Sequence, residues 1–283
     1  MTLVADQTGA LIGQPALKIR DEADAAQARA RVKALLAVPL TPNAAVEIAL
    51  LNNRALQAAY NDLGVSETEM VETILPPAPS FSFVHLTGAE LEIERQVTQN
   101  ILALLTLPRR REIAEDRFKV AQARAVQATL STASEARRAY FRAVAAAQSV
   151  KVLEQSRASA EAVSELAKKL GETGALPKLE QAREHAFYAD VVGDLATARL
   201  RQRGERESLN RALGLWGPDL AYRLPDKLPA LPSAPRKPTD IEAEAVTSRI
   251  DIQIARMELA AMAKEYGLTR ATRFINTLEA SGV

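Results

Sequence analysis

The chain contains one long stretch, Arg111 to Leu170, that has neither glycine nor proline: REIAEDRFKVAQARAVQATLSTASEARRAYFRAVAAAQSVKVLEQSRASAEAVSELAKKL. Alanine, glutamate, arginine, glutamine, leucine and lysine dominate it, and these residues lose least free energy on entering a helix. A helix of about 60 residues is roughly 90 Å long at 1.5 Å per residue. We therefore predict a helix that begins near Pro108 and is far longer than those of compact enzymes. Such a rod fits a coiled-coil spacer or the wall of a tube.

A tight turn follows the long helix at residues 171–177, with the sequence GETGALP. Beyond it, a second helix is predicted to run to about Leu213 and to stop at residues 214–218, GLWGP. Apolar residues recur at steps of three and four in both segments, which indicates an antiparallel helical hairpin with an intermittent coiled-coil seam. The predicted seam comprises Ala136, Tyr140, Val144, Ala147, Val150, Leu153, Ala160, Val163, Ala167 and Leu170 before the turn, and Leu179, Ala182, Ala186, Ala189, Val192, Leu195 and Ala198 after it.

The composition limits the classes of function. The 283 residues are 47% hydrophobic but only 4% aromatic, so the core must be built mainly from alanine, leucine and valine. The net charge of +1 implies no general attraction to nucleic acid, and we expect no such partner. The absence of cysteine excludes thiolate metal sites, disulfides and thiol catalysis. No apolar run approaches the roughly 20 residues of a membrane-spanning helix, and no secretory signal is visible, so we expect a cytoplasmic protein or a piece of a longer precursor.

The N-terminal part is predicted to begin with a tail and one short helix. Residues 1–40 contain this tail and a helix over residues 21–37. A stronger helix start follows, with Thr41 as the N-cap and Pro42 at the first helical position. This next helix is predicted to end by Leu75, because the prolines that follow forbid its continuation.

Between residues 80 and 100 the hydrophobic period changes from helical to two, which predicts a β-hairpin. Residues 80–86 form the first predicted strand, residues 87–89 the turn and residues 90–97 the second strand. Its apolar side chains are Phe81, Phe83, Leu91, Ile93 and Val97, with Arg95 as the exception on their face of the second strand. The opposite face carries Glu90, Glu92, Glu94 and Gln96. Such a hairpin fits a water-exposed sheet edge and a strand pair lining a water-filled barrel equally well.

A proline-rich connector at residues 218–238 separates the helical hairpin from the last part of the chain. A second capped helix is predicted from Ile241 to about Tyr266, where Gly267 and the residues after it end it. Residues 271–283 fit another strand.

This last helix repeats the one that begins after Thr41. An offset of 196 residues (245 − 49 = 196) places Ala49 on Ala245 and Gln57 on Gln253. The repeat makes residues 41–217 one complete structural repeat and residues 239–283 the beginning of a second. We therefore interpret the chain as a fragment.

The order of these features resembles the TolC-type outer-membrane efflux proteins, over nearly everything from about Arg31 to Val283. The resemblance rests on AVEIALLNNRALQAAY at residues 45–60, LTLPRRREIA at 105–114, RRAYFRAVAAA at 137–147, LGLWG at 213–217 and SRID at 248–251. It implies a mainly α fold with a small β part. Long antiparallel helical hairpins would form a periplasmic α-barrel, and the β-hairpin would contribute to a transmembrane β-barrel, in a homotrimer.

The resemblance also implies a function, that of the outer-membrane channel in a tripartite efflux pump or type I secretion system. Such a channel is a passive export duct across the periplasm and the outer membrane, whose lipid surrounds its strands. Its partners would be a periplasmic membrane-fusion adaptor and an inner-membrane transporter. The tip residues that would contact the adaptor are Leu170, Gly171, Gly174, Ala175 and Leu176. The barrel hairpin would use Phe81, Phe83, Leu91, Ile93 and Val97.

The residues themselves leave alternatives open. A soluble periplasmic helical-hairpin scaffold or adaptor also fits, with its strands in a small sheet. Nothing places His85 and His185 together or beside a carboxylate pair, so solvent or packing positions are favoured. The run Arg109–Arg111 is interpreted as a solvated helix start in preference to a phosphate site. Because no nucleophile–base pair, phosphate loop or metal-ligand spacing is visible, we expect neither a cofactor nor an enzyme.

Overall fold

The computed structural model of the chain describes residues 1–14, 16–87, 91–231, 241–275 and 277–282. The chain divides into two compact units, each assembled from segments that are far apart in the sequence. The sheet unit consists of Met1–Gln7, Ala58–Ala128 and Pro238–Val283. The tip unit consists of Thr8–Gln57 and Thr129–Lys237.

One helix, α5 (Ile101–Glu172), contributes residues to both units and is 72 residues long, or roughly 110 Å at 1.5 Å per residue. The start predicted near Pro108 is wrong. Asn100 is the residue that starts the helix, because its Oδ1 accepts a hydrogen bond from the backbone N–H of Ala103 at 2.8 Å. Pro108 lies inside the helix, where it removes one backbone hydrogen bond without ending the element.

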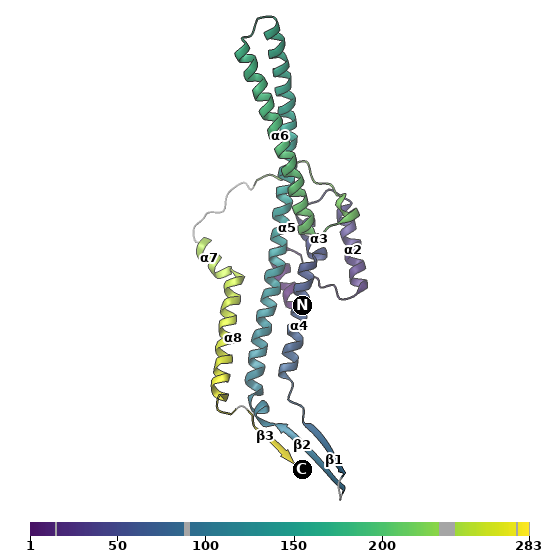
Figure 1. The fold of residues 1–283 in the computed structure, drawn as a ribbon, viewed down its shortest axis with the longest axis vertical. Helices are drawn as coiled ribbons and strands as arrows, with labels where there is room; N and C mark the ends of the chain where they lie inside the picture. Colours follow the sequence, from purple (N-terminus) through teal and green to yellow (C-terminus); the bar gives the residue numbers. More distant parts are fainter. Residues whose placement is uncertain (15, 88–90, 232–240, 276, 283) are drawn as a thin grey trace. The chain divides into compact units, whose positions relative to one another are not determined.

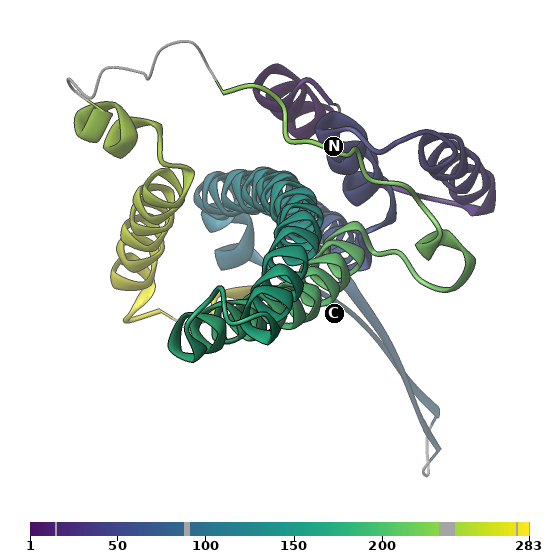
Figure 2. The same cartoon turned by 90° about the horizontal axis from the view of Figure 1, so that it is seen from above.

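The return helix α6 (Lys178–Leu213) runs antiparallel to the second half of α5 (Figure 1), and the view from above in Figure 2 shows the two green helices side by side near their connecting turn. The predicted helical hairpin is confirmed. It ends at Gly214, which has a left-handed φ of +68°. The N–H of Leu215 then donates to the carbonyl oxygen of Asn210 at 2.9 Å, which satisfies one of the last carbonyls of the helix.

The seam between α5 and α6 is narrower than predicted. The residues Ala136, Tyr140, Val144, Val150, Ala160, Ala167 and Leu195 are buried, as predicted. Val163 and Leu179 are instead 47% and 63% exposed, and Ala182, Ala186, Ala189 and Val192 are exposed as well, so this part of the prediction is wrong. Two helices that meet along a line bury one stripe on each, and the α6 stripe includes Val191, next to the residue predicted.

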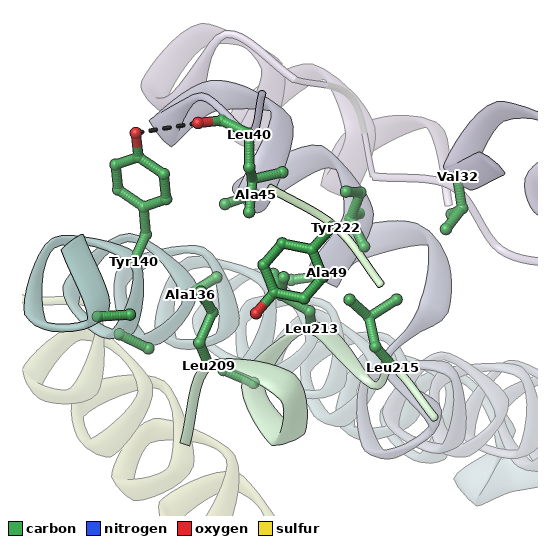
Figure 3. Packing of buried hydrophobic residues seen from close by; sticks show 14 of the residues in the cluster. Val32, Leu40, Ala45, Ala49, Ala136, Tyr140, Leu209, Leu213, Leu215 and Tyr222 are labelled. Carbon is green, nitrogen blue, oxygen red and sulfur yellow. Dashed lines mark hydrogen bonds between the residues drawn. The ribbon is translucent and has the colours of Figure 1, made fainter. Parts of the chain in front are cut away.

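The core of the tip unit lies where α2 (Glu22–Leu36) and α3 (Pro42–Asn52) pack near the second half of α5 and the end of α6 (Figure 3). Alanines such as Ala49 and Ala136 allow the backbones to approach closely. Two buried tyrosines add polar anchors. Tyr140 donates its hydroxyl proton to the carbonyl oxygen of Leu40 at 3.0 Å. Tyr222, which follows the short 3-10 helix η1 (Gly217–Leu220), donates to Asn210 Oδ1 at 2.9 Å.

The helix predicted from Thr41 to Leu75 is two helices, α3 and α4 (Arg54–Ile74), so the prediction of one continuous helix is wrong. Thr41 is the N-cap of α3 and Pro42 its first residue, as predicted. Asn53 has an extended ψ of 110° between the helices, and its Oδ1 accepts a hydrogen bond from the N–H of Leu56 at 3.2 Å. Asn53 thus ends one helix through its extended backbone and caps the next through its side chain.

The helix predicted over residues 241–266 is also two helices, α7 (Ile241–Ser248) and α8 (Ile250–Thr272). The break is at Arg249, whose ψ is 116°. Gly267 does not end α8, contrary to the prediction, because one glycine inside a helix costs only about 1 kcal/mol relative to alanine.

The sheet unit contains three antiparallel strands in the order β1 (Ser80–Thr87), β2 (Leu91–Asn100) and β3 (Glu279–Gly282). In Figure 1 the yellow β3 lies beside the blue β2, although most of the chain separates them in sequence. The predicted hairpin and C-terminal strand are therefore present. Thr87, predicted as the first residue of the turn, is instead the last residue of β1. The other two turn residues, 88 and 89, and residue 90 of the second predicted strand lie outside the described residues.

The N-terminus contains a helix that the sequence analysis missed. Residues 1–20 were predicted to be a tail, but α1 (Thr2–Ile12) begins almost at the first residue. Its sequence shows little amphipathic period, yet Val4 and Thr8 are fully buried. Packing, and not the local pattern, selects this helix.

Candidate functional site

The turn between α5 and α6 is held by backbone hydrogen bonds onto the end of α5. The N–H groups of Ala175 and Leu176 both donate to the carbonyl oxygen of Leu170, at 2.9 and 3.2 Å. Gly174 has a φ of +76°, a conformation that residues with a Cβ rarely adopt. At Gly171 a Cβ would lie 2.5 Å from Oε1 of Gln181. The turn is therefore closed by backbone hydrogen bonds to Leu170 and by a glycine in the left-handed region.

The predicted tip residues lie together at this turn. Gly174 and Ala175 are exposed, Gly171 and Leu176 are half-buried, and Leu170 is at the exposed end of its helix. Further apolar side chains on both helices are exposed near this turn. The predicted seam did not place any of them on the surface. They are Val163, Leu166 and Leu170 on α5, at helical spacing, and Leu179 and Phe187 on α6.

One polar pair lies in the seam near this tip. The hydroxyl of Ser164, which is buried on α5, is hydrogen-bonded to Nδ1 of His185 on α6. The sequence favoured a packing or solvent position for His185, and the structure places it in a helix-to-helix contact. No group of three or more metal-ligating side chains occurs among the residues that the structure describes.

The β-hairpin presents chemically different faces. Phe81 pairs with Val97, and Phe83 pairs with Arg95, across β1 and β2. Paired residues of antiparallel strands share a face, so these four side chains lie together. The phenylalanines are 70% and 76% exposed, and Arg95 lies 5.9 Å from the ring of Phe83 in a cation–π contact.

The opposite face of the hairpin is polar. It carries the paired residues Ser80 with Thr98 and Ser82 with Gln96. The predicted residues Leu91 and Ile93 belong to β2, but their side chains lie outside the described part of the hairpin. Within the described residues, the hairpin therefore exposes an apolar face bearing one arginine and a second face without large apolar side chains.

A set of ion pairs joins α8 to α5 in the sheet unit. Lys264 Nζ lies 2.5 Å from Asp116 and 2.7 Å from Glu112. The hydrogen bond to Lys264 is the largest cause that lowers the pKa of each carboxylate, and the hydrogen bonds to Asp116 and Glu112 raise the pKa of Lys264. Arg117 with Glu265, and Arg124 with Glu258, pair along the same helices, both at 2.6 Å. Sequence spacing within one helix gives no signal for such pairs, because the partners are more than a hundred residues apart.

The three arginines at residues 109–111 of α5 differ in the contacts that their side chains make. Arg109 pairs with Glu112 at 3.1 Å and Arg111 with Glu115 at 2.9 Å, both on their own helix. Both side chains are exposed, as predicted, but they lie inside α5 and not at its start, which follows Asn100. Arg110 differs, because it is half-buried and lines two hollows of the sheet unit. No helix among the described residues combines the length and the apolar character that crossing a bilayer requires.

The two helix breaks are equivalent positions. Asn53 and Arg249 are separated by the 196-residue offset of the internal repeat. At the first break, the N–H of Asn53 donates to Ala49 and its carbonyl accepts from Gln57, at 2.9 and 3.2 Å. At the second, Arg249 makes the same two bonds with Ala245 and Gln253, at 3.0 and 3.2 Å. The repeat found in the sequence is thus also a repeat of backbone geometry.

Comparisons with known proteins place this fold. No protein-family model matches the chain, and no curated protein matches it. Among solved structures, the CmeC outer membrane channel of Campylobacter jejuni is 19% identical, with a TM-score of 0.68 over 85% of this chain and 55% of that one. CusC, whose structures concern transmembrane channel formation, is 16% identical, with a TM-score of 0.67 over 86% and 59%. The outer membrane protein VceC of Vibrio cholerae is 15% identical, with a TM-score of 0.60 over 91% and 67%.

The chain spans little more than half the length of the first two of these proteins. In this chain the matched span contains the long helices of the antiparallel hairpin and the strands of the three-stranded sheet. The chain has the fold of the TolC-type outer-membrane channels.

Proposed function

We propose that this chain is part of the outer-membrane duct of a tripartite efflux pump or a type I secretion system. In this function it is a passive conduit, and an inner-membrane transporter supplies the energy. The observation that carries the proposal is the likeness of fold to solved outer-membrane channels over 85% of this chain.

The equivalent breaks support the division of the chain into repeats. Residues 41–217 are the first repeat and residues 239–283 begin the second. The short strand β3, which follows α8, pairs with β2 of the first repeat, so strands of successive repeats are neighbours in one sheet. A sheet that grows in this way needs further strands to satisfy its edges, and a homotrimer supplies them by closing the strands into a barrel.

The faces of the hairpin support a position in the outer membrane. Exposed Phe81, Phe83 and Val97 fit a surface covered by hydrocarbon, while Ser82 and Gln96 fit a water-filled lumen. Lipid excludes water from the face that bears Phe81, Phe83 and Val97 only if the barrel is inserted into the outer membrane. The alternative of a soluble scaffold leaves both faces in water.

Cysteine labelling separates these possibilities. The 283 residues contain no cysteine, and the reading frame without an introduced cysteine serves as the blank for labelling elsewhere. Four variants of the complete reading frame that contains this chain each carry one cysteine, at one residue of the two cross-strand pairs. The substitutions are Phe81→Cys, Val97→Cys, Ser82→Cys and Gln96→Cys. In isolated outer membranes, a membrane-impermeant maleimide should label positions 82 and 96 and leave positions 81 and 97 unlabelled. Protein unfolded in urea should react at all four. Equal labelling of all four positions in membranes would favour the soluble scaffold.

The turn at residues 171–177 is proposed to contact a periplasmic membrane-fusion adaptor. Its hydrogen-bonded backbone and the exposed apolar residues Leu166, Leu170 and Leu179 suit a docking surface of low ordering cost. A photo-crosslinking residue at Ala175 should capture the adaptor. The same residue at Ala196, which is exposed in the middle of α6, serves as the control. Capture from both positions, or from neither, would argue against docking at the tip.

A further inference from the structure

Two adjoining hollows in the sheet unit share the residues Arg110 and Leu268. The first has a volume of about 310 Å³ and lies among α4, α5 and α8, with Met70, Ile113 and Phe118 among its apolar residues. The second, of about 280 Å³, lies between the start of α5 and the end of α8 and includes Leu102. We name the two together the Arg110 groove. Each hollow is near the lower limit of the roughly 300–1,000 Å³ that small-molecule sites occupy.

Among the residues that the structure describes, Arg110 is the member of an arginine triplet that makes no ion pair. Its neighbours Arg109 and Arg111 bind Glu112 and Glu115 on their own helix, which neutralises both. Successive residues of a helix point about 100° apart, so Arg110 is directed to another side. In the described part of the chain Arg110 makes no ion pair, and it is half-buried.

The other charges of the groove do not neutralise Arg110. Arg117 and Glu265 line the first hollow but pair with each other at 2.6 Å. Glu69 also lines the first hollow and is exposed, and among the described residues it makes no ion pair with Arg110. In the second hollow, Arg110 is the one charged residue among the described lining residues. The groove therefore offers one guanidinium next to the apolar side chains of the first hollow, whereas the lining of the second hollow also includes the polar residues Asn100, Thr106 and Thr272.

We propose that the Arg110 groove binds an anionic amphiphile, with one acidic head group and a hydrocarbon chain of fatty-acid size. The head group pairs with the guanidinium of Arg110, which can hold a carboxylate through two parallel hydrogen bonds. The hydrocarbon chain covers Met70, Ile113 and Phe118, so apolar surface is removed from water at both partners.

This inference does not depend on the duct function. All residues of the groove belong to the sheet unit, so binding requires neither a trimer nor a partner protein. A failure of the labelling experiment on the hairpin would leave the groove in place, and a failure to bind amphiphiles would leave the duct proposal in place.

The test is a fluorescence titration of the purified 283-residue chain with dansyl-labelled undecanoate, in one buffer for all arms. Two further probes carry the same tail with a neutral amide or a cationic amine as the head group. We expect the undecanoate to bind about tenfold more tightly than the amide, as one charge-assisted hydrogen-bonded contact predicts. Arg110→Gln should remove this preference. Arg109→Gln, next to it but outside both hollows, should change the affinity by less than about twofold.

A charge reversal keeps the test decisive if Arg110→Gln perturbs folding. Arg110→Glu should turn the preference from the undecanoate to the cationic amine, a result that partial unfolding cannot produce. Three probes of equal affinity, or an equal loss in Arg109→Gln, would overturn the proposal. Inorganic phosphate is added as a competitor. If it displaces the undecanoate at equal concentration, the site takes a free anion and the assignment to an amphiphile is wrong.

Discussion

Lys264 Nζ lies 2.5 Å from Asp116 Oδ2, so the last long helix of the chain is ion-paired to a helix that begins more than a hundred residues earlier. Glu112 takes part in the same cluster, at 2.7 Å from the ammonium group. The three charges are only partly shielded from water, so the cluster is sensitive to pH and to salt.

The pH dependence of this cluster follows from the direction of each pKa shift. Lys264 lowers the pKa values of Asp116 and Glu112 from their ordinary 3.8 and 4.5, so their stabilisation is present above these values and is lost as the pH falls through the lower folded values. The pKa of Lys264 is raised from 10.5, so its stabilisation is present below that value and is lost as the pH rises through the higher folded value. Stabilisation by the cluster is complete between about pH 5 and pH 10.

Lys264→Met should therefore lower the free energy of unfolding at neutral pH and reduce the additional loss on acidification. Urea titrations at pH 7 and pH 3 measure both effects. Lys168→Met, which removes an exposed lysine without an ion pair in the described part of the chain, is the control and should leave both unchanged. The idea fails if the two variants have the same pH profile.

Gly214 should not tolerate a side chain. Its φ is +68°, and a Cβ there would lie 2.7 Å from the backbone oxygen of Asn52. A left-handed conformation alone costs an L-residue roughly 1–2 kcal/mol, so Gly214→Ala should lower the free energy of unfolding by about 2 kcal/mol or more. Gly204→Ala is the matched control, because Gly204 is inside α6 with nothing within 4 Å of its Cβ position. It should stabilise the chain by about 0.5–1 kcal/mol. Chemical denaturation of both variants gives the comparison, and an equal effect would contradict it.

The sequence was sufficient for the parts of this fold that local chemistry determines. The long hairpin follows from an unbroken run of helix-forming residues, and Thr41, Pro42 and Gly214 mark helix ends by cap chemistry that requires no tertiary partner. The alternation of the β-hairpin and the 196-residue repeat were likewise visible in the residues alone.

What the sequence missed depends on distant contacts. The break at Asn53 is supported by Asn52, whose Nδ2 donates to the carbonyl oxygen of Gly214 at 2.7 Å. No local sequence pattern shows that the end of α6 packs against Asn52. The Lys264 cluster and the groove at Arg110 have the same origin, because each requires two helices that the sequence does not show to be neighbours.

The hydrogen bond between Tyr222 and Asn210 should contribute measurably to stability, since both residues are buried. Tyr222→Phe leaves Asn210 Oδ1 without this donor and should cost about 1–3 kcal/mol. The ring is retained, so the contact with the guanidinium of Arg206, 4.6 Å away, is kept. Asn210→Leu should also be costly alone, and the double variant should cost less than the sum of the two. Additive effects in this double-mutant cycle would mean that the bond contributes nothing of its own.

The equivalent breaks should both accept proline at the residue that follows them. Arg54 and Ile250 are the first residues of α4 and α8, where the backbone N–H has no partner within the helix and a φ near −65° is already required. The preceding residues, Asn53 and Arg249, have the extended ψ that a residue before proline prefers. Arg54→Pro and Ile250→Pro should therefore be neutral or stabilise the chain by about 0.4–1 kcal/mol, through the lower entropy of the unfolded chain.

The control for this prediction is Ala255→Pro, which places the same residue at an exposed position inside α8 and should cost about 3 kcal/mol. Thermal unfolding followed by circular dichroism ranks the three variants. If Ile250→Pro destabilises as much as Ala255→Pro, the helix is continuous through Arg249 in solution. A tolerated proline at both breaks would instead mean that the two positions share a backbone conformation as well as a place in the repeat.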